Sequence, residues 1–428
     1  MAKLLYIVLD GAADGFDPER SSLRRANTPG LDALARNALC TLVYTVRKGI
    51  APESDVAVMS LLGYDPEKYY TGRGPLEALG AGIPVKRGDL ALRANFATVD
   101  PRTLRIIDRR AGRSVTSEEA AKLAESLDGM ALDGGKARAV FRATIGHRAV
   151  LVIRHSEMEL DARISNTDPA YERVGLISHA RREYEPYIQK AVPLVDTPGA
   201  RKAAELVNEF TVKAIEILDK HPVNEERRRR GLLPANAVLL RDAGDRPPEA
   251  PPFAELYGFS MASIVEMVVE RGIARALGLR DIPVRVEGRP REELLREEAE
   301  KAVEALQSHG GVYVHLKGPD EPGHDGDFDS KVEAIEQIDS HFISYVLDNV
   351  DRENTIIVVT SDHATPWYLK AHSDDPVPLM ISHPALKGPG AFDEVTCRDN
   401  MSLPILDRGY KIVPTVIDVS RSLGLPIG

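Results

Sequence analysis

The run LLYIVL at residues 4–9, followed at once by Asp10 and Gly11, is the stretch that decides the fold. It is short, almost continuously apolar and contains β-branched residues, which is typical of a parallel strand buried on both faces. Residues 312–316 and 355–360 have the same character, and each run also ends at a polar cluster. Because ligands bind beyond the carboxyl ends of parallel strands, we expect the three clusters to converge on one site.

Helical periodicity between these strands completes an α/β pattern. Apolar residues recur at helical spacing opposite Glu, Lys and Arg in residues 118–127, 200–218, 262–276, 291–307 and 331–350. The alternation predicts an α/β fold with a doubly wound sheet.

The hydrophobic pattern of the sequence changes between about residues 90 and 190. Short β-branched or alternating runs occur there, at residues 90–99, 137–143 and 149–153. We therefore expect residues 1–90 and 190–428 to form a discontinuous core domain, and residues 91–189 to form an inserted α+β domain that is a candidate lid. The Pro-rich residues 244–252 are interpreted as a stiff loop rather than a domain linker.

Composition narrows the classes of function. The 428 residues carry 65 acidic and 55 basic side chains, a net charge of −10, which argues against a general nucleic-acid or acidic-membrane surface. Only Cys40 and Cys397 are present, which indicates a reducing compartment. Neither a signal-peptide pattern nor an apolar run of about 20 residues occurs. We expect a cytoplasmic protein, of thermophilic composition, with no nucleic-acid or membrane partner; a homo-oligomer stays open.

Carboxylates and imidazoles follow the predicted strands. Asp320 and His324 stand four apart, and because Pro322 and Gly323 disfavour a helix we expect them on a tight loop. Taken alone, an Asp or a His at such a position is more often a turn residue or a helix cap than a metal ligand. Together they fit a two-metal site for phosphoryl transfer, with Mn²⁺ the best match and Co²⁺, Zn²⁺ or Mg²⁺ as alternatives. The six residues are Asp10, Asp320, His324, Asp362, His363 and His372.

Ser54 is the candidate nucleophile. Pro52 and Glu53 precede it, and apolar residues at helical spacing follow, so Ser54 is expected in the first turn of a helix. The positive end of the helix dipole would favour a phosphoryl group there. The alternative is that Ser54 is only a helix N-cap.

Four further residues are candidates for binding an anionic substrate. Arg73 lies in a glycine-flanked loop and offers two parallel donors to a phosphate or carboxylate. Lys317 and Arg241 stand at the ends of apolar runs, and Asn95 lies within RANFATVD at residues 93–100. A surface arginine or a side chain that satisfies backbone groups is the alternative in each case.

The order of these residues resembles the alkaline phosphatase superfamily, and the whole chain is similar to the archaeal branch of cofactor-independent phosphoglycerate mutases. The stretches that carry the resemblance are ESDVAVMSLLGYDP (53–66), YYTGRGPLEALGAGIPV (69–85), RANFATVD (93–100), DRRAGR (108–113), HPVNEERRRRGLLPAN (221–236), HLKGPDEPGHDGD (315–327) and SDHATP (361–366). Glu53 and Val58 depart from it, since the family usually has Gly and Asn at these positions.

The resemblance implies a site and an activity. One metal site would consist of Asp10, Ser54, Asp362 and His363, the other of Asp320, His324 and His372, and Ser54 would carry the phosphoryl group. The implied reaction interconverts 3-phosphoglycerate and 2-phosphoglycerate in glycolysis and gluconeogenesis without 2,3-bisphosphoglycerate. The alternatives are a phosphatase, another phosphomutase such as one acting on phosphopentoses, and a metal-binding homologue without activity.

Overall fold

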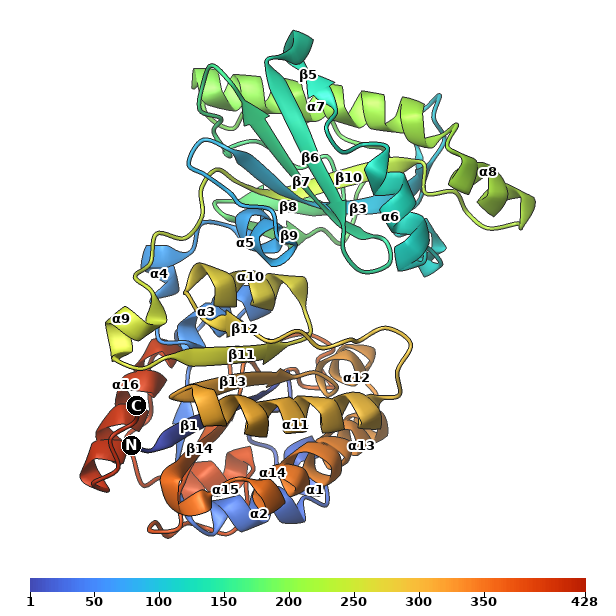
Figure 1. The fold of residues 1–428 in the computed structure, drawn as a ribbon. Coiled ribbons are helices and arrows are strands. Elements are labelled where there is room, and N and C mark those ends of the chain that lie inside the picture. The colour runs from blue at the N-terminus through green and yellow to red at the C-terminus, as the bar shows by residue number, and fades with distance from the viewer. The chain divides into compact units, whose positions relative to one another are not determined.

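The computed structural model describes residues 1–428 and divides them into two compact units (Figure 1). Unit 1 comprises Met1–Tyr70 and Ala250–Gly428, and unit 2 comprises Thr71–Glu249. Unit 2 is wider than the insertion expected at 91–189. The Pro-rich segment 244–252 spans the boundary at Glu249 and Ala250, so it connects the units and its interpretation as a loop within one domain is wrong. None of the helices has the length and apolar character that crossing a membrane requires.

Unit 1 is built on a seven-stranded sheet in the order β12-β11-β13-β1-β14-β15-β2. Five strands are parallel, and β15 runs antiparallel to both of its neighbours. The predicted strands β1, β13 and β14 are confirmed as adjacent and parallel. The bounds are β1 (Lys3–Leu9), β2 (Ala38–Val43), β11 (Met261–Val265), β12 (Arg280–Asp281), β13 (Gly311–Leu316), β14 (Thr355–Ser361) and β15 (Val377–Ser382).

Twelve helices surround this sheet. They are α1 (Ser22–Arg25), α2 (Pro29–Ala35), α3 (Ser54–Leu61), α4 (Pro66–Tyr69), α9 (Phe253–Tyr257), α10 (Val268–Ala276), α11 (Arg291–Ser308), α12 (Asp320–Asp325), α13 (Phe328–Ile338), α14 (Ser344–Asn349), α15 (Glu394–Asp399) and α16 (Ile412–Ser422). Every residue of β1 after Lys3 is at most 1% exposed, so helices cover both faces of the sheet, as a parallel sheet requires.

Three local predictions differ from the structure. The helix predicted at 262–276 is wrong in its first part, because the buried run Met261–Val265 pairs with β13 as a strand and the helix begins only at Val268. The helix predicted at 331–350 is interrupted by a π-helical turn at Asp339–Ile343. The Asp339 carboxylate there accepts the backbone N–H groups of Gly30 and Leu31, at the start of α2, which accounts for its inward position.

The third difference is the segment around Asp320, where the predicted tight loop is the short helix α12. Pro322 is its third residue, so the missing N–H falls among first-turn amides that have no helical partner in any case.

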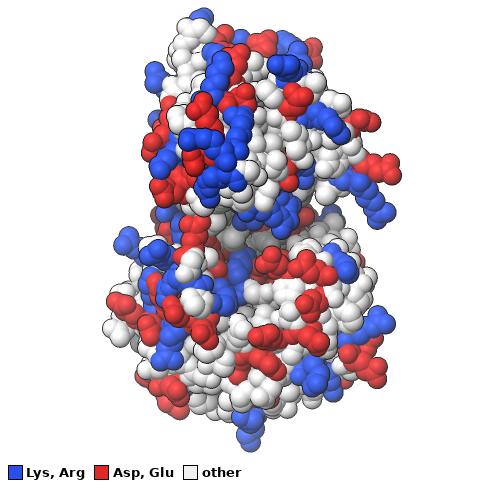
Figure 2. All heavy atoms as spheres, turned by 90° about the vertical axis from the view of Figure 1, so that its right-hand side faces the viewer, with Lys and Arg blue, Asp and Glu red and all other residues white.

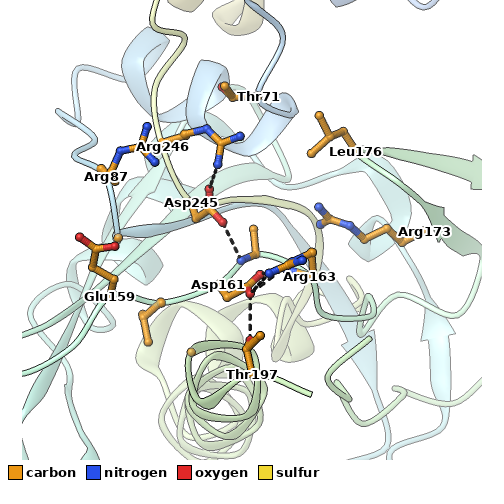
Figure 3. Close-up of a pocket in the computed structure, with 14 residues that line it drawn as sticks. Thr71, Arg87, Glu159, Asp161, Arg163, Arg173, Leu176, Thr197, Asp245 and Arg246 are labelled. Carbon is orange, nitrogen blue, oxygen red and sulfur yellow. Dashed lines mark hydrogen bonds and ion pairs between the residues drawn. The ribbon is translucent and has the colours of Figure 1, made fainter. Parts of the chain in front are cut away.

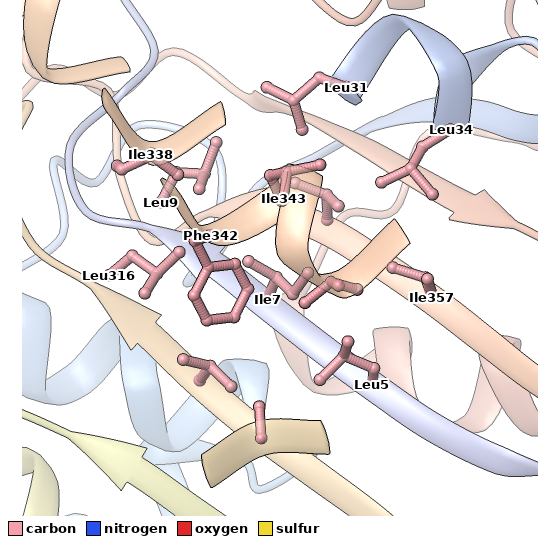
Figure 4. Packing of buried hydrophobic residues seen from close by; sticks show 14 of the residues in the cluster. Leu5, Ile7, Leu9, Leu31, Leu34, Leu316, Ile338, Phe342, Ile343 and Ile357 are labelled. Atoms are coloured by element: carbon pink, nitrogen blue, oxygen red, sulfur yellow. The ribbon is translucent and has the colours of Figure 1, made fainter. Parts of the chain in front are cut away.

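The core of unit 1 lies between β1 and the helices on one face of the sheet (Figure 4). Leu5, Ile7 and Leu9 alternate along β1 and point to the same face. Leu31 of α2 and Phe342 of the π-helical turn belong to the same fully buried cluster. This packing fixes the position of the carboxyl end of β1, which Asp10 follows directly.

Unit 2 is an antiparallel sheet in the order β10-β3-β7-β6-β5, with β4 beside β3 and a separate hairpin of β8 and β9. Its bounds are β3 (Leu90–Val99), β4 (Ile106–Asp108), β5 (Ala131–Leu132), β6 (Ala137–Ala143), β7 (Arg148–His155), β8 (Tyr171–Val174), β9 (Ile177–Ala180), β10 (Ala237–Gly244), α5 (Arg73–Gly80), α6 (Ser117–Glu125), α7 (Pro198–Leu218) and α8 (Pro222–Arg229). The strands predicted at 90–99, 137–143 and 149–153 are confirmed.

The width of unit 2 follows from its packing. The apolar face of α7 shares a buried cluster with the sheet, and Phe210 of α7 lies 5.7 Å from the Phe141 ring of β6. Strand β10 is an edge of the same sheet. Residues 191–249 therefore belong to unit 2. Amphipathic periodicity alone does not reveal which of the two cores a helix packs against. On the face that Figure 2 displays, acidic and basic side chains are interspersed over the surface.

Candidate active site

The carboxyl ends of β1 and β14 bring three candidate ligands together. Asp10 follows β1 directly, and Asp362 and His363 follow β14. His363 Nε2 lies 3.1 Å from Asp362 Oδ2 and 3.6 Å from Asp10 Oδ1. All three residues are buried, and one ligand atom from each lies within 4.8 Å of the others.

Two carboxylate oxygens in this group lack a partner. Asp10 Oδ1 and Asp362 Oδ2 are buried and accept no hydrogen bond. The other oxygen of each carboxylate has a partner, Lys317 Nζ for Asp10 and the Gly11 N–H for Asp362, so one buried oxygen of each is left unsatisfied, which is destabilising. The donor set of two carboxylates and one imidazole therefore fits a divalent cation.

Asp320 gathers a second group of ligands, beyond the end of β13. It begins α12, and His324 follows one helical turn later on the same face. Asp320 Oδ1 lies 3.5 Å from both His324 Nε2 and His372 Nε2, and these two nitrogens are 3.1 Å apart. Asp320, His363 and His372 also have ligand atoms within 4.8 Å of one another.

The charges of the second group are strongly coupled. Burial opposes ionisation of Asp320, but the hydrogen bond from His372 and the nearby His363 and His324 hold its pKa well below the usual range. Burial likewise opposes a charge on His372, yet Asp320 raises its pKa to about 9. The lowered pKa of Asp320 and the raised pKa of His372 describe one ion pair, in which protonated His372 supplies the positive charge beside the carboxylate.

The three histidines share one orientation. The Nδ1 atom of each faces an anchoring oxygen: Pro52 O for His372 at 2.6 Å, Lys370 O for His324 at 3.3 Å and Thr365 Oγ1 for His363 at 2.9 Å. Each Nε2 is left to face the carboxylates. An imidazole that donates from one nitrogen presents a lone pair at the other, which is the form that binds a metal.

Ser54 lies against the first group. It is the first residue of α3, as predicted, and the N-cap position belongs to Glu53. Its Oγ is 3.2 Å from His363 Nε2. The Glu53 side chain is exposed and makes no capping hydrogen bond. Ser54 therefore reaches the carboxylate and imidazole group directly, and the first turn of α3 leaves backbone N–H groups beside it.

Behind the first group lies a set of charged residues that sequence reasoning missed in part. Lys317, one of the predicted substrate-binding residues, has its Nζ 3.0 Å from Asp10 Oδ2 and also pairs with Glu270. His315 Nε2 is 3.5 Å from Asp362 Oδ2. Burial lowers the pKa of His315, but Glu270 and the two aspartates outweigh it and raise the pKa to about 10. A histidine inside the otherwise apolar run 312–316 was the available signal.

The other three predicted substrate-binding residues lie in unit 2. Arg93 and Asn95 alternate on β3 and so share one face of the sheet. Arg241 of β10 is the cross-strand partner of Arg93, and Arg148 of β7 is that of Asn95. Arg73 begins α5, with its Nε 3.0 Å from Glu77 Oε1.

These side chains form what we call the arginine cluster: Arg73, Arg93, Arg148 and Arg241. Burial, together with Arg73 and Arg241, lowers the pKa of Arg93 to about 9. Burial and then Arg148 likewise lower the pKa of the adjacent His147 to about 4. Asn95 Oδ1 and Arg241 Nε are buried without a hydrogen-bond partner. The sequence pointed to Arg73 and Arg241 but not to Arg93 and Arg148, although β alternation from Asn95 would have found Arg93.

A hollow of about 580 Å³ elsewhere in unit 2 has a different character (Figure 3). Arg163 pairs with Asp161 at 2.6 Å, and Arg246 pairs with Asp245 at 3.1 Å. None of the predicted site residues lines the hollow. Three of its four arginines thus have carboxylate partners, with Glu249 the partner of Arg87, and Arg173 donates to the Gly175 carbonyl. The hollow is not the candidate site.

A mixed α/β sheet that ends in carboxylates and imidazoles beside a serine has the make-up of a metal-assisted phosphoryl-transfer enzyme. Comparison with known proteins places the chain further. The family model for 2,3-bisphosphoglycerate-independent phosphoglycerate mutase matches residues 35–224. A protein of that name from Aeropyrum pernix is 59% identical over 97% of this chain and 99% of its own length. Another from Methanopyrus kandleri is 43% identical over 89% of this chain and 87% of its own.

Solved structures agree with this. A protein from Pyrococcus horikoshii is 31% identical, covers 98% of this chain and 97% of that chain, and has a TM-score of 0.78. The cofactor-independent phosphoglycerate mutase from Thermoplasma acidophilum is also 31% identical, covers 98% of this chain and 100% of that chain, and has a TM-score of 0.65. The chain belongs to the 2,3-bisphosphoglycerate-independent phosphoglycerate mutase family and is an enzyme of the isomerase class.

Proposed function

We propose that this enzyme interconverts 3-phosphoglycerate and 2-phosphoglycerate through a phosphoserine at Ser54, without 2,3-bisphosphoglycerate. The observation that carries the proposal is the contact of Ser54 Oγ with His363 Nε2 beside two buried carboxylates. The names of the relatives from Aeropyrum pernix and Methanopyrus kandleri support the substrate pair.

Two divalent ions, Mn²⁺ being the best match, would occupy the two groups of ligands. Asp10, Ser54, Asp362 and His363 would hold one, and Asp320, His324 and His372 the other. When bound, such ions stabilise charge on the attacking, leaving and phosphoryl oxygens. The unpartnered oxygens of Asp10 and Asp362 support this assignment.

Ser54 carries the chemistry in two steps. Its Oγ forms a bond to phosphorus as the bond between phosphorus and the 3-oxygen of the substrate breaks, the serine proton passes to a base in the site, and glycerate takes up a proton at its freed oxygen. The glycerate then turns, and its 2-hydroxyl attacks the phosphoserine and restores Ser54. The N–H groups at the start of α3 stabilise the phosphoryl oxygens.

Cations would hold the carboxylate and phosphate of the substrate. The arginine cluster brings four guanidinium groups together, and burial together with the neighbouring arginines lowers the pKa of Arg93 and of Arg148, which favours binding of an anion there. Asn95 adds a polar atom without a partner on the same face. Lys317 in unit 1 is a separate cation beside Asp10.

Water must be kept from the phosphoserine, because hydrolysis would convert the mutase into a phosphatase. The lid role expected for residues 91–189 stays a prediction, to be tested by the ratio of phosphate released to 2-phosphoglycerate formed. Location in the cytoplasm and the oligomeric state are likewise predictions, and a cell-fractionation assay and light scattering would check them.

The decisive test replaces Ser54 with Ala and follows 2-phosphoglycerate by coupling to enolase. Turnover should fall by at least about 10⁴-fold, while Mn²⁺ binding is largely kept because six of the seven ligands remain. Ser60→Ala is a matched control, since Ser60 lies in the same helix, is buried and makes no hydrogen bond through Oγ. Retained mutase activity in Ser54→Ala would refute the nucleophile, and release of phosphate by the wild type would point to a phosphatase.

A further inference from the structure

Thr365 lies between the two groups of candidate ligands, and its hydroxyl contacts both. Its Oγ1 is 2.7 Å from Asp320 Oδ1 and 2.9 Å from His363 Nδ1. The residue is completely buried, so the hydroxyl is out of reach of a substrate. Thr365 is three residues beyond Asp362, and nothing in the sequence motif distinguishes it from an ordinary turn residue.

The proton inventory of these contacts fixes the form of His363. A threonine hydroxyl has one proton, and a carboxylate has none to donate, so Thr365 donates to Asp320. The same oxygen can then only accept from His363, which places a proton on Nδ1. In the neutral ring Nε2 therefore carries the lone pair, and this is the nitrogen that faces Ser54, Asp10 and Asp362.

The backbone of Thr365 is itself held in place. Its N–H donates to the carbonyl of Ala13, the second residue after Gly11, at 2.9 Å. Lys331 Nζ, which is fully buried, donates to the Thr365 carbonyl at 2.8 Å and to Asp14 Oδ1 at 2.6 Å. A buried lysine that neutralises Asp14 and binds two backbone carbonyls is a rigid anchor rather than a mobile side chain.

Two glycines leave no room for Thr365 to move. A Cβ at Gly11 would lie 2.7 Å from Thr365 Oγ1 and 2.6 Å from Asp320 Oδ1. A Cβ at Gly323 would lie 2.6 Å from the Thr365 carbonyl oxygen. Gly11 also has a φ of +59°, which disfavours a side chain at this position. Segments that follow β1, β13 and β14 therefore close tightly around one hydroxyl.

We propose that Thr365 is a positioning residue whose single hydroxyl fixes the tautomer of His363 and the orientation of Asp320 together. One side chain then sets the geometry of both groups of ligands, so its loss would weaken both. The inference rests on the proposed function, because the two groups are taken as metal sites. Its structural part, the position of the proton on His363, is independent of metal.

The test compares Thr365→Val with Thr365→Ser and with a control, Thr41→Val. Thr41 of β2 is equally buried in unit 1, and its hydroxyl donates to the Pro404 carbonyl at 3.1 Å rather than to a candidate ligand. Titration of the metal-free proteins with Mn²⁺ by calorimetry measures affinity without turnover. Thr365→Val should bind Mn²⁺ about 10- to 100-fold more weakly at both sites, as loss of an outer hydrogen-bond partner typically does. Thr365→Ser should stay within about threefold of the wild type.

Unfolding separates a positioning role from a structural one. Thr365→Val loses two hydrogen bonds and Thr41→Val loses one, so both variants should be less stable than the wild type. Only Thr365→Val should bind Mn²⁺ more weakly, and Thr41→Val should bind it like the wild type. Wild-type affinity in Thr365→Val, or equal weakening in both valine variants, would overturn the proposal.

A second measurement works even if Thr365→Val fails to fold. In the metal-free wild type labelled with ¹⁵N-histidine, the His363 signals, identified by their loss in His363→Gln, should show a proton on Nδ1, the nitrogen that faces Thr365. An Nδ1 without a proton would overturn the proposal. If the wild type binds no Mn²⁺ at all, the proposed function fails, while the tautomer measurement still decides the role of Thr365.

Discussion

The candidate ligand group of unit 1 is built around buried carboxylates, whereas the arginine cluster of unit 2 is built around guanidinium groups. In unit 1 the carboxylates of Asp10, Asp320 and Asp362 crowd together, and two of their oxygens have no partner. In unit 2, burial and then the neighbouring Arg73 and Arg241 lower the pKa of Arg93 in the arginine cluster to about 9. Incompletely compensated buried charge is destabilising, so the carboxylate oxygens without a hydrogen bond favour a cation in unit 1, and the lowered pKa of Arg93 favours an anion in unit 2.

The hollow in unit 2 sharpens this contrast. Its arginines are as numerous, but Arg163 and Arg246 already pair with aspartates. The number of charged side chains around a cavity is therefore a poor guide to a ligand. The balance of charges, and the polar atoms left without a partner, are better guides.

Removal of divalent ions should have the largest effect, because it acts on the unit 1 group. Chelation is expected to abolish detectable turnover and to lower the free energy of unfolding by about 2 to 3 kcal/mol for each of the two sites, relative to Mn²⁺ at 100 times its Kd. Calorimetric melting and the enolase-coupled assay, with each ion added back in turn, measure both. Full activity in the chelated enzyme would contradict the reading of unit 1.

Loss of one guanidinium from the arginine cluster should come next. Under the proposed function, Arg148→Met would remove a charge-assisted hydrogen bond to the substrate, which is worth about 1.5 to 3 kcal/mol, so KM should rise about 10- to 100-fold with a smaller change in kcat. Arg163→Met is the control in the hollow and should leave KM within about twofold. An equal change in both variants would erase the distinction between the two regions of unit 2.

Glu394 is a buried acidic residue of unit 1 that avoids a buried charge by keeping its carboxyl group protonated. Burial is the main cause that raises its pKa to about 7, although it accepts hydrogen bonds from Ser21 and the Asp14 N–H. The folded state keeps this proton above the unfolded pKa of about 4.3, so stability should fall by about 2 kcal/mol from pH 5 to pH 8 and level off above the folded pKa. Urea unfolding of Glu394→Gln across this range should lack that contribution; an unchanged pH dependence would refute it.

The smallest expected effect is on His147, which reports the field of the arginine cluster. Burial and then Arg148 lower its pKa to about 4. An anion bound at the cluster would offset the positive charge and raise the pKa by about one unit, equal to about 1.4 kcal/mol. Proton NMR titration with and without 3-phosphoglycerate measures this shift. No shift at saturating ligand would place the anion site elsewhere.

The sequence predicts the parts of the fold that depend on local pattern. β1, β13 and β14 are buried apolar runs, and the rule that parallel strands end at one edge brings Asp10, Asp320 and Asp362 together. Residues 262–265 are a strand where the pattern predicts the start of a helix, because so short a buried run fits either period. The extent of unit 2 was missed because the apolar face of α7 fits any core of suitable shape.

The arginine cluster shows why part of a site escapes such reasoning. Arg93 and Arg148 become neighbours through the register of β3 with β7 and β10, which no local pattern specifies. Lys317 was identified as a cation, but its contacts with Asp10 and Glu270 depend on β13 lying beside β1. The metal and nucleophile assignments rest on geometry that agrees with the prediction, and they await the experiments above.

The position of β1 in the sheet has a consequence for synthesis of the chain. Its two hydrogen-bonding neighbours, β13 and β14, follow roughly 300 residues later, which is about 15 to 60 s of translation at about 5 to 20 residues per second. During that time β1 cannot pair with β13 or β14, so both edges of this apolar strand stay open. Unit 2, in contrast, is one continuous stretch of sequence and can fold as soon as it is synthesised. The newborn chain is therefore prone to aggregate through β1, and a chaperone that shields it would raise the yield of folded enzyme.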